Sequence, residues 1–125
     1  MIPKFRAWDK QDKIISEVLS IDFLINVAEL YYRKEDEQYV KPFSDIILEQ
    51  STGLKDKNGK EIFEGDIFEY PHLGITKAVV VYKHGNWYLN NLELENEHDL
   101  LWTECELGEV IGNIYENPEL LEVDE

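Results

Sequence analysis

Cysteine and long apolar runs are both scarce in this chain of 125 residues. The single cysteine, Cys105, cannot form an internal disulfide, and it matches no metal or redox spacing. No apolar run approaches the roughly 18 residues that a membrane-spanning helix needs, and the first residues lack the apolar stretch of a secretory signal. We therefore expect a cytoplasmic protein without membrane segments, in which Cys105 is a packed, neutral thiol.

Basic residues are missing from the last part of the chain. The net charge is −15. Residues 1–50 hold seven Lys or Arg and ten Asp or Glu, residues 51–90 hold five of each, and residues 91–125 hold twelve acidic residues and no basic one. A surface of this sign repels phosphate backbones and gains nothing from counterion release. We do not expect it to bind nucleic acid directly.

Clusters of metal-binding or catalytic residues are also missing. The three histidines are too far apart in sequence for a metal-ligand pair, and the serines and threonines near residue 50 have no paired histidine for a hydrolytic site. Alternating carboxylates after residue 92 lack the glycine-centred loop of a calcium site. The sequence thus predicts no catalytic residue, no metal and no cofactor, and we expect a protein that is not an enzyme. The histidines are His72, His84 and His98.

Three glycines, Gly53, Gly59 and Gly65, stand six residues apart. Neither the P-loop nor the dinucleotide-binding loop uses this spacing, and no long helix follows to bind an anion. We interpret them as turn residues. Asn58-Gly59 is a strong hairpin signal because both residues tolerate positive φ, and Glu64-Gly65-Asp66 marks a second turn.

Short runs of β-branched and aromatic residues alternate with turn residues along the chain, which predicts a mostly β protein. Residues 76–82 give the clearest strand, and a turn at 83–86 leads into its partner at 87–89. Residues 20–33 fit either a helical face or strands, and we favour strands because the neighbouring runs are short and β-rich.

The acidic part of the chain gives weaker local signals. Residues 90–109 suggest an ordered but irregular loop, and residues 109–115 return to a strand. Asn117 followed by Pro118 is typical of a cap and first position, which predicts a short helical turn.

Three segments carry a family resemblance. Residues 52–67 (TGLKDKNGKEIFEGDI) resemble the signature of the YopX family of bacteriophage and prophage proteins. Residues 4–9 (KFRAWD) resemble the opening strand of that family, and residues 110–121 (VIGNIYENPELL) resemble its closing motif. The three segments occur in order and anchor nearly the whole chain.

The resemblance implies a mostly β fold with a strand-rich part in residues 1–50. A small SH3-like barrel would follow in residues 51–121, and residues 122–125 would form an acidic tail. The family has no established activity, so the resemblance assigns no catalytic residue. It implies that the protein is found in the cytoplasm of bacteria that carry a phage or prophage, and that the motif residues have a structural role. The expected turn and core residues are Gly53, Asn58, Gly59, Gly65, Asp66, Gly112 and Pro118.

We consider three functions. The first is a non-enzymatic phage accessory protein that acts through protein contacts or homo-oligomerisation, since small barrels have strand edges that pair. The second is an acidic decoy that imitates a nucleic-acid backbone and inhibits a basic protein. The third is weak nucleic-acid binding through barrel lysines. The candidate interaction face comprises Glu93, Glu95, Glu97, Asp99 and Trp102, and the lysines are Lys55, Lys57, Lys60, Lys77 and Lys83.

Overall fold

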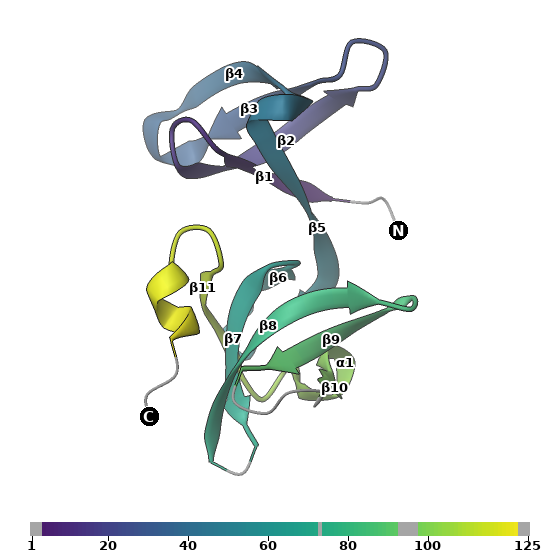
Figure 1. Cartoon of the computed structure of the whole chain (residues 1–125), viewed down its shortest axis with the longest axis vertical. Helices are drawn as coiled ribbons and strands as arrows, with labels where there is room; N and C mark the ends of the chain where they lie inside the picture. The colour runs from purple at the N-terminus through teal and green to yellow at the C-terminus, as the bar shows by residue number, and fades with distance from the viewer. Residues whose placement is uncertain (1–3, 73, 93–97, 123–125) are drawn as a thin grey trace. The chain divides into compact units, whose positions relative to one another are not determined.

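Antiparallel β-strands dominate the computed structural model, which describes residues 4–72, 74–92 and 98–122 (Figure 1). The chain divides into two compact units, Met1–Gln50 and Ser51–Glu125. Each unit has its own cluster of buried apolar side chains. The prediction of a mostly β protein is confirmed.

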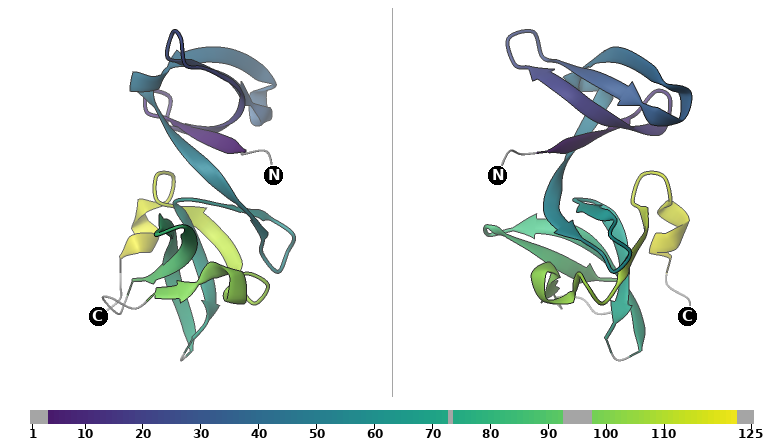
Figure 2. Two further views of the ribbon diagram at one scale, coloured as in Figure 1. Left: turned by 90° about the vertical axis from the view of Figure 1, so that its right-hand side faces the viewer. Right: turned by 180° about the vertical axis from the view of Figure 1, so that it is seen from behind.

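The first unit is a curved antiparallel sheet with the strand order β4-β3-β2-β1-β5 (Figure 2). Segment 20–33 forms the end of β2, a turn, β3 and the first residue of η1, so the preference for strands over a helix is confirmed for most of it. Pro42 ends β4, which lies at the sheet edge, where a residue without an N–H is tolerated. The elements are β1 (Phe5–Asp9), β2 (Ile14–Asp22), β3 (Val27–Tyr32), η1 (Arg33–Glu35), β4 (Glu37–Pro42), η2 (Phe43–Asp45) and β5 (Ile46–Lys55).

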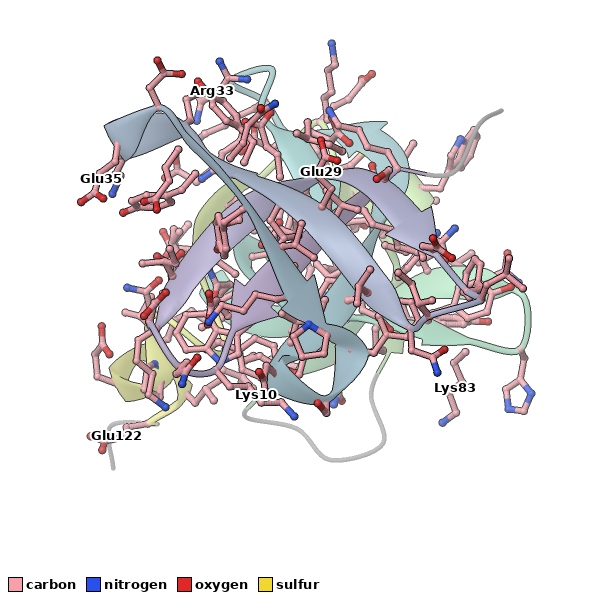
Figure 3. All side chains as sticks on the ribbon, turned by 90° about the horizontal axis from the view of Figure 1, so that it is seen from above. Lys10, Glu29, Arg33, Glu35, Lys83 and Glu122 are labelled. Carbon is pink, nitrogen blue, oxygen red and sulfur yellow. The ribbon has the colours of Figure 1, made fainter. Side chains whose placement is uncertain are left out.

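Small and medium apolar side chains fill the core of this unit, because alternate residues of each strand face inward. Ala28 and Leu30 on β3 are fully buried. Glu29 between them, labelled in Figure 3, is exposed. Arg6 and Glu49 form a cross-strand ion pair, Nε to Oε1, of 3.0 Å. The buried cluster is Ala7, Ala28, Leu30 and Ile46, with Val18, Tyr39, Phe43 and Leu48 packed against it.

In the second unit, β5 continues and pairs with β6, and five further strands follow the order β10-β9-β8-β7-β11. Among the described residues β10 and β11 lie at opposite edges of that sheet and do not pair. The strand pairings in this sheet are antiparallel. Because its two edge strands do not pair in the described part of the chain, a closed SH3-like barrel stays a prediction. The elements are β6 (Glu61–Phe63), β7 (Asp66–Pro71), β8 (Ile75–Lys83), β9 (Asn86–Asn91), β10 (His98–Leu100), α1 (Leu101–Glu104), β11 (Glu109–Asn113) and η3 (Pro118–Leu121).

The core of the second unit is larger and more aromatic. Phe68 and Tyr70 on β7 are almost fully buried, and Leu101 and Cys105 cover them from α1 and the turn after it. The predicted hairpin of β8 and β9 is confirmed, and its two turn residues, His84 and Gly85, both have positive φ. The buried cluster is Ile62, Phe68, Tyr70, Ala78, Val80, Leu89, Leu101 and Cys105.

Two local predictions were wrong. Residues 98–104 form β10 and α1 instead of an irregular loop, because Leu101 and Cys105, one helical turn apart, both face the core. Pro118 begins η3 as expected, but the side chain of Asn117 does not cap it. Instead, Asn117 Oδ1 accepts a hydrogen bond from the Asn113 N–H at 3.2 Å.

Candidate interaction surfaces

The family-like segment 52–67 is organised around the buried carboxylate of Asp56. Asp56 Oδ1 accepts hydrogen bonds from the N–H groups of Asn58 and Lys60, each at 2.9 Å. Its Oδ2 accepts one from Val110 on β11, also at 2.9 Å. Burial alone would raise the pKa of Asp56, but these three donors and the nearby Lys60 charge outweigh it and hold the pKa below its ordinary value. Asp56 therefore fastens the loop between β5 and β6 to β11.

The three glycines of this segment take positive φ in different settings. Gly59 (φ +80°) is the fourth residue of a five-residue connection between β5 and β6, in which Asn58 does not share the positive φ that a two-residue turn would need. Gly65 (φ +83°) lies in the tight turn between β6 and β7. Gly53 (φ +78°) lies inside β5 at an irregularity in its pairing with β6, so its interpretation as a turn residue was wrong.

Asp66 and the closing motif also bind backbone groups. Asp66 Oδ2 accepts from the Phe63 N–H at 2.8 Å across the turn at Gly65. Asn113 Oδ1 accepts from the N–H groups of Tyr115 and Glu116. Gly112 lies against Asn117, whose Oδ1 would be 2.5 Å from a Cβ at position 112. These contacts give the motif residues a role in holding the fold.

The structure describes part of the candidate interaction face. Glu93, Glu95 and Glu97 lie outside the described residues. Asp99 on β10 is partly buried and accepts a hydrogen bond from the Tyr70 hydroxyl at 2.6 Å, with His72 Nδ1 3.7 Å from the same oxygen. Trp102 on α1 is 75% exposed.

An apolar tip that the sequence did not reveal lies in the first unit. We call Phe23, Leu24 and Ile25, in the turn between β2 and β3, the Leu24 tip. Their exposed fractions are 76%, 95% and 66%. The signal that could have found them is Asp22 before and Asn26 after three apolar residues, because both residue types favour turns.

The Leu24 tip is held in one conformation by its neighbours. Asp22 Oδ1 accepts from the Leu24 N–H at 2.9 Å, and Asn26 has a φ of +56°. Phe43 N–H donates to the Asn26 carbonyl oxygen at 2.9 Å, and the Phe43 ring meets the Phe23 ring edge-on at 5.9 Å. The tip is therefore an ordered apolar projection rather than a loose loop.

Groups suited to chemistry are few in the described part of the chain. Cys105 is buried, and burial, followed by the charge of Glu106, raises the pKa of its thiol. In residues 4–72, 74–92 and 98–122, no group of three or more His, Cys, Asp or Glu side chains is arranged to hold a metal ion. None of the helices in these ranges has the length and apolar character to cross a membrane.

The fold and these surfaces define a two-unit antiparallel β protein whose sequence motifs hold turns and strands together. The family model described as YopX protein matches residues 4–122, and the chain belongs to the YopX family, as the sequence predicted. The crystal structure of protein EF1440 from Enterococcus faecalis is similar, with 33% sequence identity and a TM-score of 0.61. The similarity covers 98% of this chain and 99% of that one. No curated protein matches the chain significantly.

Proposed function

We propose that this chain is a non-enzymatic bacteriophage or prophage protein of the bacterial cytoplasm that acts by binding another protein. The observation that carries the proposal is the Leu24 tip. Three consecutive apolar side chains, each at least 66% exposed, form an ordered projection, and Leu19 on β2 and Val40 on β4 are further exposed apolar residues of the same unit. Contiguous exposed apolar surface of this kind is typical of protein interaction sites.

Charge favours another protein over a second copy of this chain or a lipid surface. The chain carries a net charge of −15, so two copies repel one another, as do the chain and an anionic membrane. Asp22 and Glu29, both exposed, lie near the tip on β2 and β3. An apolar pocket on a neutral or basic protein therefore suits the Leu24 tip best.

The experiment compares two serine variants of the full chain in bacterial cells that carry the phage or prophage. The variant F23S/L24S removes two residues of the tip. I75S removes an apolar residue of the second unit that is 70% exposed, close to the 76% of Phe23. We expect a co-purified protein that is lost with F23S/L24S and kept with I75S. Equal recovery with all three chains would overturn the proposal. A dimer dissociated by F23S/L24S, measured by light scattering, would replace the partner with a second copy.

The acidic decoy is a second candidate, supported by the twelve acidic residues and absence of basic ones in residues 91–125. It predicts that changing Glu93, Glu95 and Glu97 to Gln and Asp99 to Asn weakens binding to a basic protein and flattens its salt dependence. Unchanged binding and salt dependence would refute it.

We further propose that the second unit curls into the small SH3-like barrel implied by the family resemblance. Support comes from β7, which pairs with both β8 and β11, and from the bulge between Val110 and Gly112, since bulges bend strands. Cross-strand contacts between β10 and β11 in an experimental structure would decide it. Their absence there would leave an open sheet.

A further inference from the structure

A second group of exposed apolar side chains lies on α1 and its flanks in the second unit. Trp102 is 75% exposed, and Leu100 and Leu107, 41% and 56% exposed, belong to the same short segment. We call these three residues the Trp102 surface. Single exposed apolar residues are ordinary, but three within residues 100–107 form a local concentration.

The backbone beneath the Trp102 surface is fixed. Leu101 and Cys105 point the other way into the core, and the Cys105 N–H donates to the Leu101 carbonyl oxygen at 2.8 Å. Leu107 N–H donates to the Glu104 carbonyl oxygen at 3.0 Å. Leu101 and Cys105 fill the core from this segment, so core packing does not explain why the Trp102 side chain faces solvent. Tryptophan is also among the residue types most enriched at the energetic centres of protein interfaces.

The charges around the Trp102 surface identify the kind of partner. Asp99, Glu104 and Glu106 belong to the same segment, and residues 91–125 contain no Lys or Arg. Lys57 lies next to this segment, because its N–H donates to the Gly108 carbonyl oxygen. One lysine does not balance the three carboxylates, so the segment stays acidic. A second copy would present the same acidic residues, and nucleic acid and anionic lipid would be repelled.

We infer that the Trp102 surface docks onto a protein that presents an apolar patch rimmed by Lys and Arg. Trp102 and Leu107 supply the apolar contact, and the surrounding carboxylates select the basic rim. This inference goes beyond the proposed function, which rests on the Leu24 tip of the first unit. It also differs from the acidic decoy, because the decoy depends on charge alone and needs no tryptophan.

The test uses the full chain, labelled with ¹⁵N, and two synthetic amphipathic helical peptides with the same leucine face. One peptide carries Lys and Arg on its polar face, and the other carries Glu. We expect the basic peptide to shift the amide signals of residues 99–107 and the Trp102 indole signal, with binding that weakens as salt rises. W102A should bind at least about tenfold more weakly, L107S should also weaken binding, and L24S should bind like the natural chain.

Several results would overturn this inference. They are equal binding by W102A, equal binding of the acidic peptide, or signal shifts confined to other parts of the chain. Adsorption to neutral phosphatidylcholine vesicles that needs Trp102, without peptide binding, would replace the protein partner with a membrane. A Trp102-dependent dimer in sedimentation would replace it with a second copy. A ¹⁵N spectrum of W102A with unchanged core signals, checked first, excludes unfolding as the cause of any loss.

Discussion

Asp56 shows how a single side chain connects segments that are far apart in the sequence. Its two oxygens bind the loop before β6 and the start of β11, 54 positions away. The sequence favoured a turn at Asn58-Gly59, but it contained no signal that a neighbouring aspartate holds the turn or reaches Val110. A hydrogen bond of this range depends on the completed fold, so no local pattern could have predicted it.

The pH dependence of stability tests the role of Asp56. Its folded pKa lies below the ordinary value of 3.8, so the ionised carboxylate stabilises the fold above that value. This contribution disappears as the pH falls through the folded pKa. We expect D56N to lower the free energy of unfolding at pH 7 by about 1–3 kcal/mol, measured by urea denaturation.

The difference between D56N and the natural chain should shrink as the pH falls below 3.8. E35Q, which changes an exposed carboxylate of η1, should leave stability nearly unchanged at every pH. If D56N and E35Q changed the free energy of unfolding equally at pH 7, the Asp56 hydrogen bonds would not stabilise the fold more than an exposed carboxylate does.

Gly108 is a position where packing forbids a side chain. A Cβ there would press into the Glu69 carbonyl oxygen and lie 2.6 Å from Phe68 Cε2, and both groups belong to β7. We expect G108A to lower the free energy of unfolding by about 1–3 kcal/mol through this crowding. G59A meets open space and costs only the strain of its positive φ, about 1 kcal/mol. Thermal unfolding that ranks G59A as the less stable variant would contradict this account.

At the scale of elements, strands with strong β propensity could be predicted, and those defined by tertiary contacts could not. The hairpin of β8 and β9 was predictable because its strand residues and turn residues agree. Residues 98–104 were not, because β10 and α1 are short and depend on burial of Leu101 against the core. The exposure of the Leu24 tip was missed because apolar residues in a β-rich stretch are normally expected to be buried.

The hydroxyl of Tyr70 anchors β10 to β7 through Asp99. We expect Y70F to destabilise the chain by about 1 kcal/mol and to speed hydrogen exchange of the amides in β10 and α1 most strongly. Y82F removes a hydroxyl from a ring that is 55% exposed and serves as the control. A uniform rise in exchange over both units would indicate global rather than local loosening.

The charge of the whole molecule sets what it can bind. The net charge is −15, and the five exposed or partly exposed lysines of residues 51–90 are balanced by five acidic residues in the same range. Binding to a phosphate backbone would therefore release few counterions. We expect no retardation of single-stranded or duplex DNA in a gel at low salt. Retardation that is lost when Lys55, Lys57 and Lys60 are changed to Gln would support the third hypothesis instead.

Partner binding through the Leu24 tip can be tested by photo-crosslinking in bacterial cells that carry the proposed phage or prophage. Benzoylphenylalanine replaces Leu24 in one version of the chain. In the control it replaces Lys34 of η1, which follows the other end of β3. We expect a crosslinked product of one discrete size from position 24, containing a protein other than this chain, and none of that size from position 34. Crosslinks only between copies of this chain, or the same products from both positions, would contradict it.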